Sequence, residues 1–455
     1  MLSRRQFLAA SASLAAAQPA GRPNILFLLG DDQRWDTLGC MGNKLVKTPH
    51  IDSLAQRATI FDNCFVTTSI CATSRASILS GQYARTHGVH NFADTFKPGR
   101  FQLTYPQLLR AAGYRTGFIG KYGVGNKMPA GEFDYWRGFP GQGKYFPQGE
   151  PGPHLTEIMG NQALEFMQPA QPWCLSISFK AAHVQDEDPR QFLPSPATEH
   201  LYDGVKFPEP PTMHPRDIAR FPFSIQRSEN RRRFVVRFGT PALYQESVRN
   251  YYRLISEIDT QVGRIVEHLR QTNQLDNTVI VYSGDNGFYL GEHGLAGKWF
   301  LHEESVRVPL IVFDPRTKGG IRRPETVLNI DIAPTLLAAA GLPAPTGTQG
   351  RNLLPLTRGE KAPNWRTEFF YEHLLPNDWI PKTEGVRTNE WMYCRFLDEK
   401  PLFEELYNLK QDPREEHNLA TDPRYKSQLD TMRAKWQRWR SHLESYDPAT
   451  PFREV

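Results

Sequence analysis

The sequence has few cysteines, little excess charge of either sign and no long apolar run. Five cysteines in 455 residues are too few for a disulfide-built scaffold, and their odd number leaves at least one thiol free. The net charge of +5 falls to +3 without the first 17 residues, which carry Arg4 and Arg5 and no acid, so nucleic-acid binding is not indicated. No stretch approaches the roughly 20 apolar residues of a membrane span, so stable membrane insertion is not expected.

The composition itself is that of a globular protein. Apolar residues make up 39% of the chain and aromatic residues 12%, which excludes a disordered, collagenous or coiled-coil chain. At roughly 150 residues per domain, the length predicts about three domains, or one large domain with an appendage.

The N-terminus has the pattern of an export signal. Residues 1–17 combine a short basic region, an apolar Ala/Ser/Leu run and a small-residue cleavage site near residues 15–17. Ser3-Arg4-Arg5-Gln6-Phe7-Leu8 resembles a twin-arginine signal, which a receptor reads as an address. We therefore expect the twin-arginine translocase to export the chain to the periplasm or beyond; the alternative, an ordinary membrane anchor, is disfavoured by the short apolar stretch.

Alternation of strands and helices predicts an α/β fold. Residues 24–29 and 278–283 are continuous apolar runs typical of strands buried on both faces, and 116–119 and 174–179 are shorter examples. Apolar residues at three- and four-residue spacing over 248–269 predict a helix. The expected fold is a large mixed, mostly parallel sheet sandwiched by helices, with ligands bound at the carboxyl ends of the strands.

The chain changes character twice after residue 180. Residues 185–240 are rich in proline and arginine and predict a long surface insertion in a catalytic domain that spans 18–355. Residues 356–455 predict a C-terminal subdomain of short strands followed by a helix. That helix carries one apolar stripe made of Leu429, Met432, Trp436, Trp439 and Leu443.

Two acidic pairs follow two of the predicted strands. If the strands are neighbours, Asp31-Asp32 and Asp285-Asn286 bring four oxygen donors to one place, which suits Ca²⁺ or Mg²⁺ better than Zn²⁺. Taken alone, each pair is equally consistent with a turn or a helix cap.

The segment 71–82 begins with polar residues, has a helical pattern and ends at a glycine. Cys71 at a helix N-terminus, with Arg75 one turn later, predicts a stabilised thiolate or a cradle for an anion. The alternative is a buried structural cysteine with Arg75 on the solvent side.

Taken together, these motifs resemble one family along nearly the whole mature chain. Cys71-x-Thr-Ser-Arg75, Gly120-Lys121-Tyr122, Ser283-Gly-Asp285-Asn286-Gly and Gly291-Glu-His-Gly with Lys298 resemble the formylglycine-dependent sulfatases of the alkaline phosphatase superfamily. The segments 329–337, 406–413 and 418–420 also resemble family landmarks. The resemblance implies that a maturation enzyme oxidises Cys71 to formylglycine before export.

The resemblance also implies the roles of the site residues. Asp31, Asp32, Asp285 and Asn286 would hold Ca²⁺ together with modified Cys71, whose hydrated aldehyde attacks sulfur. Arg75 would orient this nucleophile, Lys121 and Lys298 would neutralise the sulfonyl oxygens, and His183 would protonate the leaving oxygen. Alone, His183 and the two lysines would be taken for structural or solvated residues.

Three positions depart from the family pattern. Gly123 stands where the family usually has a histidine, and Thr73 and Gln82 are unusual within the cysteine motif, which puts full maturation in doubt. A phosphodiester or phosphonate ester hydrolase of the same superfamily stays open as an alternative, because the family's sites for the two kinds of ester are nearly interchangeable. A catalytically silent glycan-binding homologue also stays open, for the case that Cys71 remains a thiol and Gly123 marks a decayed site.

The expected substrate is a sulfated carbohydrate. Arginines at 227, 231, 232, 233 and 237 are candidates to contact such an anionic glycan. The alternative is a solvated, partly disordered basic loop, because runs of charge are usually solvated.

Overall fold

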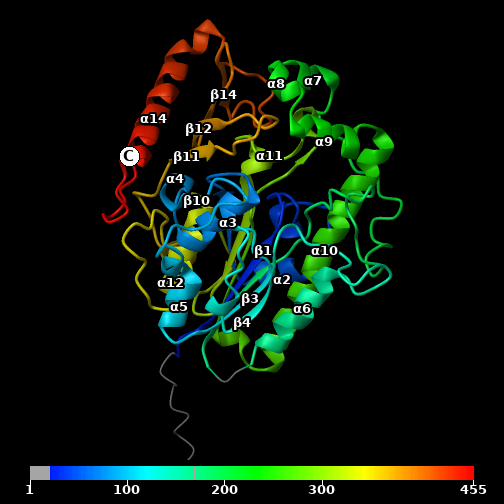
Figure 1. Ribbon diagram of the computed structural model, residues 1–455, viewed down its shortest axis with the longest axis vertical. Helices are drawn as coiled ribbons and strands as arrows, with labels where there is room; N and C mark the ends of the chain where they lie inside the picture. Colours follow the sequence, from blue (N-terminus) through cyan, green and yellow to red (C-terminus); the bar gives the residue numbers. More distant parts are fainter. Residues whose placement is uncertain (1–20, 169–170) are drawn as a thin grey trace, which may run out of the picture.

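The computed structural model describes residues 21–168 and 171–455 and shows one large sheet with a smaller sheet at one end (Figure 1). The predicted signal at 1–17 lies outside the described residues. None of the helices in the described ranges combines the length and the apolar character needed to cross a membrane. All five cysteines are free thiols, which confirms that the fold is not built on disulfides.

The large sheet is mixed and mostly parallel, as expected. Its strand order is β10-β2-β9-β6-β1-β5-β3-β4, and β9 alone runs antiparallel to its neighbours β2 and β6. The strands are β1 (Asn24–Gly30), β2 (Thr59–Phe65), β3 (Arg115–Lys121), β4 (Tyr135–Phe139), β5 (Trp173–Ser178), β6 (Thr278–Gly284), β9 (Arg307–Phe313) and β10 (Ile321–Leu328).

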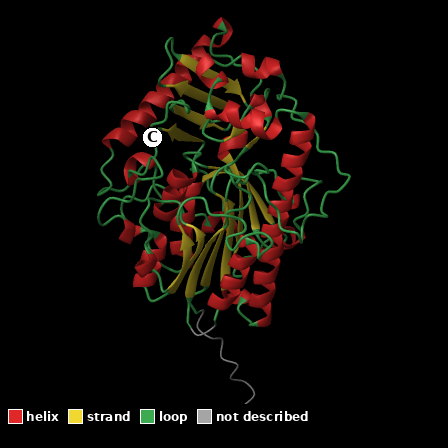
Figure 2. Cartoon of the chain, turned by 45° about the vertical axis from the view of Figure 1, so that its right-hand side comes forward, coloured by secondary structure: helices red, strands yellow, loops and turns green. Residues whose placement is uncertain are grey.

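Helices cover both faces of this sheet (Figures 1 and 2). Alternate residues of β1 face opposite layers: Phe27 packs in the core beneath one helical layer and Leu28 in the core beneath the other. The first layer holds α3 (Cys71–Ser80), α4 (Ala84–His87), α5 (Tyr105–Ala111), α12 (Ile332–Ala339) and α13 (Leu354–Thr357). The second holds α2 (Pro49–Ala55), α6 (Leu155–Phe166) and the long α10 (Pro241–Gln271). This two-sided burial explains the uninterrupted apolar runs in the sequence.

The segment 185–240 differs from a partly disordered loop. It forms α7 (Pro215–Ala219), α8 (Phe223–Gln226) and α9 (Glu229–Phe238), and α9 packs against the short hairpin of β7 (Tyr289–Leu290) and β8 (Ala296–Gly297). Arg237 is buried and pairs with Asp186, while Arg232 pairs with Glu229 within α9. The prediction of disorder is wrong here because carboxylates pair with arginines of α9 and because this helix packs against the hairpin.

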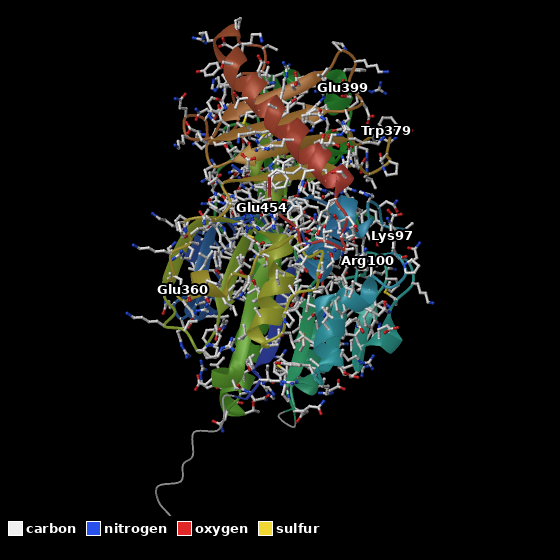
Figure 3. The ribbon with its side chains drawn as sticks, turned by 90° about the vertical axis from the view of Figure 1, so that its left-hand side faces the viewer. Lys97, Arg100, Glu360, Trp379, Glu399 and Glu454 are labelled. Atoms are coloured by element: carbon white, nitrogen blue, oxygen red, sulfur yellow. The ribbon has the colours of Figure 1, made fainter. Side chains whose placement is uncertain are left out.

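The C-terminal part is an antiparallel sheet with one helix, as predicted. Its strands are β11 (Glu368–His373), β12 (Thr383–Thr388), β13 (Trp391–Phe396) and β14 (Phe403–Asn408), in that spatial order. Helix α14 (Lys426–Ser445) crosses the outer face of this sheet (Figure 3), and all five residues of its predicted apolar stripe are buried. The inner face packs on the catalytic domain, next to the short α11 (Glu303–Val306).

Candidate active site

The two acidic pairs meet because their strands are neighbours. β1 and β6 pair in parallel with Gly30 opposite Gly284, so the residues that follow emerge side by side. The Asp32 backbone N–H donates to Asp285 Oδ1 at 3.0 Å, and Asn286 Nδ2 donates to Asp32 Oδ1 at 2.7 Å. The predicted convergence of these oxygen donors is confirmed.

Cys71 is the first residue of α3 and lies against this acidic group. Its Sγ is 3.4 Å from Asp31 Oδ1 and 3.1 Å from Lys298 Nζ. Burial, with a further contribution from Asp31, raises the pKa of the Cys71 thiol to about 12. The raised pKa indicates a neutral buried thiol at Cys71, and not the stabilised thiolate that its place at a helix N-terminus predicts.

Arg75 lies one turn further along α3 and points inward. Its Nε donates to Asp285 Oδ2 at 2.8 Å, and a second guanidinium nitrogen is 3.2 Å from Asp31 Oδ2. The side chain is only 3% exposed, which excludes the alternative that placed Arg75 on the solvent side.

Two lysines from distant segments complete the charge balance. Lys121, the last residue of β3, pairs with Asp31, and Lys298 pairs with Asp32. Both ammonium groups are almost fully buried, and the carboxylates hold the pKa of Lys298 above its usual value despite burial. Lys121, Lys298 and Arg75 thus oppose three buried carboxylates at one point. Such fixed positive charges suit the oxygens of an anionic ester.

His183 is held on a turn that is bonded to the end of β1. The Asp31 N–H donates to the Ala181 carbonyl at 2.9 Å, and the Ala182 N–H donates to the Asp31 carbonyl at 2.8 Å. His183 Nδ1 donates to the Val184 carbonyl at 2.7 Å, so Nε2 faces Asp32 Oδ2 at 3.6 Å. Burial, reinforced by the lysines, holds the pKa of His183 well below its usual value, so this Nε2 carries a lone pair in the free protein.

Unpaired oxygens indicate where a cation fits. Asp32 Oδ2 and Asn286 Oδ1 are buried and find no hydrogen-bond partner within the described part of the chain. Ligand atoms of Asp31, Asp32, Cys71 and His183 all lie within 4.8 Å of one another. A cation would satisfy both oxygens, so this donor set fits a hard cation bound mainly by oxygens.

The local structure explains why position 123 is a glycine in this chain. Its φ of +75° is the left-handed conformation, and a Cβ there would lie 2.8 Å from Arg75 Cδ. A histidine at this position is incompatible with the observed Arg75.

Sequence reasoning missed several residues that support the site. Gln142 accepts from Lys121 Nζ at 2.6 Å, and buried Lys180 donates to the Val184 carbonyl at 2.9 Å. The Tyr145 hydroxyl donates to the His183 carbonyl at 2.6 Å. Gln142 and Tyr145 lie in loops without periodicity. Of these three residues, only Lys180 stands close to a predicted site residue, three positions before His183.

A second group of ligand-type residues is not a metal site. His293, Glu304 and Glu415 bring three ligand atoms within 4.8 Å. However, Arg220 donates to His293 Nδ1 at 2.6 Å, and a neutral imidazole then carries its proton on Nε2. That nitrogen has no lone pair for a cation, and Arg220 also donates to the Glu415 carbonyl at 3.2 Å, which ties the group to the C-terminal part.

Comparison with known proteins bears on both halves of the chain. The family model described as Sulfatase matches residues 23–342, and that described as N-sulphoglucosamine sulphohydrolase, C-terminal, matches residues 291–442. An N-acetylglucosamine-6-O-sulfatase from Bacteroides thetaiotaomicron is 30% identical, with 90% of this chain and 85% of that protein covered. The N-acetylglucosamine-6-sulfatase of Capra hircus is 27% identical, with 89% and 81% covered.

Solved structures extend the likeness to the fold. A protein in complex with its substrate D-glucosamine-2-N,6-O-disulfate superposes with a TM-score of 0.79 at 27% identity, covering 94% of this chain and 99% of that one. A phosphonate monoester hydrolase from Silicibacter pomeroyi gives a TM-score of 0.81 at 24% identity, covering 94% and 96%. The second likeness shows the fold alone.

Proposed function

Because the chain belongs to the sulfatase family and is a sulfuric ester hydrolase, we propose that it cleaves sulfate esters of amino sugars, such as N-acetylglucosamine 6-sulfate. The observation that carries this proposal is the meeting of Cys71, Lys298 and the acidic pairs at one buried point. The named activities of two relatives and the substrate of the superposed complex support the amino-sugar class.

Ca²⁺ and formylglycine are the groups that this site fits. Asp31, Asp32, Asp285 and Asn286, with residue 71, would hold the ion, and the unpaired oxygens of Asp32 and Asn286 support that choice. When bound, Ca²⁺ withdraws negative charge from a sulfate oxygen, and the hydrated aldehyde made from Cys71 supplies a nucleophilic hydroxyl. An unmodified Cys71 thiol, with its raised pKa, is a poor nucleophile.

The cations prepare the site for a sulfonyl group. Lys121 and Lys298 reach the acidic group from different sides, one from the end of β3 and one from the segment after β8. Their ammonium protons would neutralise the sulfonyl oxygens where negative charge is held during sulfur transfer. Arg75, held between Asp285 and Asp31, would orient the nucleophile.

His183 would act at the leaving oxygen. The Val184 carbonyl holds Nδ1–H, and therefore Nε2 is the nitrogen that faces the acidic group. We assign protonation of the sugar oxygen to His183, which must take up a proton at Nε2 once the anionic substrate is bound.

Maturation and export follow from the same proposal. A formylglycine-generating enzyme would act on Cys71 in the cytoplasm, before the twin-arginine translocase carries the folded protein out to the periplasm or the medium. The signal pattern at 1–17 and the extracellular sulfatase among the relatives support this location.

The test uses protein produced together with a maturation enzyme. Mass spectrometry of the peptide with residue 71 should show the aldehyde in place of the thiol, and the protein should hydrolyse N-acetylglucosamine 6-sulfate. Parallel assays use 4-nitrophenyl sulfate and a phenyl phosphonate ester. Faster turnover of the phosphonate would favour the phosphonate hydrolase alternative, and no turnover of any ester by fully matured protein would refute the enzymatic role.

A further inference from the structure

The inner face of the C-terminal sheet packs on the segment that leads into Cys71. Phe369 of β11 stacks on Phe65 with ring centroids 5.2 Å apart, and Arg387, directly opposite on β12, lies 4.3 Å from the centre of the same ring. Phe65 is the last residue of β2, six positions before Cys71. This first pair of opposed residues is fully packed against the catalytic domain.

The next pair along the strands lies nearer to the candidate active site. Tyr371 shares a hydrogen bond of 2.6 Å with Ser69 and donates to the Trp299 carbonyl at 2.8 Å. Ser69 precedes Cys71 by two residues, and Trp299 follows Lys298 directly. Gly385 stands opposite Tyr371, where a Cβ would meet Leu301. Successive inner-face residues of β11, Phe369 and Tyr371, therefore contact Phe65 and then Ser69, which is closer in the chain to Cys71.

The third pair has no polar partner. His373 and Thr383 face each other across β11 and β12 on this same inner face. Both are fully buried, and neither ring nitrogen of His373 nor the Thr383 hydroxyl finds a hydrogen-bond partner in the residues described. Two positions further along, Leu375 packs with Ile70 and Trp299, so the pair lies between contacts that flank Cys71 and Lys298.

Trp299 carries a third unpaired group. Its indole Nε1 is also buried and has no partner among the described residues, and its side chain packs in the same small cluster as Leu375. A buried polar group without a partner is costly, so each of these groups would gain from a ligand that supplies a hydrogen-bond partner.

His87 shows how a structural histidine is treated in the same protein. It is as fully buried as His373, but its Nε2 shares a hydrogen bond with Ser77 at 3.0 Å and its Nδ1 accepts from the Val89 N–H at 3.1 Å. The pKa of each ring falls to about 3 because of burial, so both are neutral. The two histidines thus differ in pairing and not in burial or charge.

We propose that His373 and Thr383, with the Trp299 indole N–H, form a subsite that binds an uncharged polar group of the sugar, a hydroxyl or an acylamino group. This inference rests on the proposed function and deepens it. A neutral imidazole offers one donor and one acceptor, and so does the threonine hydroxyl, which matches a group that both donates and accepts. None of the three groups carries a charge to neutralise a second sulfate.

The first measurement is thermal stability, which requires no substrate. His373→Leu is expected to keep or raise Tm, because leucine removes unpaired polar atoms, whereas His87→Leu lowers Tm because it strands two bonded partners. If His373→Leu lowers Tm as much as His87→Leu does, His373 is paired within the protein and the proposal is wrong.

The second measurement is binding without hydrolysis. Calorimetry compares Cys71→Ala with the same protein carrying His373→Leu, and the probe is N-acetylglucosamine 6-sulfate. We expect Kd to weaken about tenfold, the loss of one discriminating hydrogen bond, and to weaken less with His373→Gln, which keeps a donor and an acceptor. Equal Kd values, or no binding to Cys71→Ala, would overturn the subsite.

Matured protein separates this result from the proposed function. His373→Leu should lower kcat/KM for N-acetylglucosamine 6-sulfate about tenfold more than kcat/KM for 4-nitrophenyl sulfate, which carries no sugar. An equal loss on both esters would place His373 in general support of the fold and refute the subsite. Absence of hydrolysis in the unaltered protein would instead refute the proposed function, while Tm and Kd would still decide the subsite.

Discussion

Two aspartates follow two strands of the same sheet and are used in opposite ways. Asp331 follows β10, and both of its carboxylate oxygens are fully paired. Oδ1 accepts from the Arg351 N–H at 2.7 Å and from the Arg366 guanidinium at 2.8 Å. Oδ2 accepts from the Leu328 N–H at 2.7 Å and also from Arg366. Asp32 follows β1, and its Oδ2 finds no hydrogen-bond donor in the described part of the chain.

Both carboxylates are buried, so burial does not tell them apart. Asp331 connects the catalytic domain to the C-terminal part and has no oxygen left for a ligand. Asp32 keeps an oxygen available beside Asn286, whose amide oxygen is also unpaired. For these two aspartates, the oxygens of Asp331 are used by the fold, whereas Asp32 Oδ2 is available to a ligand.

The largest effect is expected at Cys71. Cys71→Ala should reduce turnover to the uncatalysed background, because the proposed nucleophile is made from the side chain of this residue, while circular dichroism stays unchanged. The matched control is Cys174→Ala, a buried free thiol in β5, which should keep turnover. Wild-type turnover in Cys71→Ala would refute the assignment of residue 71 as the source of the nucleophile.

The second effect compares the two aspartates directly. In Asp331→Asn the new NH₂ meets a donor at either oxygen position, so we expect a loss of about 3 kcal/mol in the free energy of unfolding, measured with urea. In Asp32→Asn the NH₂ can take the place of unpaired Oδ2, so we expect a smaller loss of stability but a loss of turnover. Equal losses of stability would show that pairing does not distinguish the two sites.

The third effect is expected from removing or adding the cation. Chelation with EGTA should abolish hydrolysis, and added Ca²⁺ should restore it. Calcium at a hundred times its Kd should stabilise the protein by about 2.7 kcal/mol, seen as a higher Tm. The increase should shrink in Asp32→Asn and persist in Asp331→Asn. An unchanged Tm on adding Ca²⁺ would contradict the assignment of the acidic group.

The smallest effect is expected for an ion pair that faces solvent. Arg232 pairs with Glu229 within α9, and its side chain is 66% exposed. Arg232→Ala should change the free energy of unfolding by less than about 0.5 kcal/mol and leave turnover as it is. A loss on a sulfated oligosaccharide alone would instead show that the arginine run contacts the glycan.

Much of the frame was predictable from local patterns. The uninterrupted apolar runs of β1 and β6 predicted central strands, and the acids that follow them predicted the site edge. β9 escaped because Pro309 stands inside it, and β2 escaped because Asp62 and Asn63 interrupt its apolar residues. Their places depend on a mixed order in which β9 inserts antiparallel between β2 and β6, and a local pattern does not encode that order.

The site was predictable in its residues but not in its electrostatics. The motifs around Cys71, Lys121 and Lys298 located the side chains that the structure brings together. The sequence did not show that burial would raise the pKa of the Cys71 thiol, nor that Arg75 would occupy the space beside Gly123. Both depend on what surrounds a residue in three dimensions, as does the unpaired state of His373.

The stacking of Phe369 on Phe65 has a consequence for dividing the chain. A protein cut at the predicted boundary after residue 355 would expose the Phe65 ring and remove Tyr371 from the Ser69 hydroxyl, only a few residues before the proposed nucleophile. The two halves therefore cannot be exchanged between relatives as independent modules, and a chimaera with altered sugar preference has to carry the 65–70 segment and β11 from the same parent.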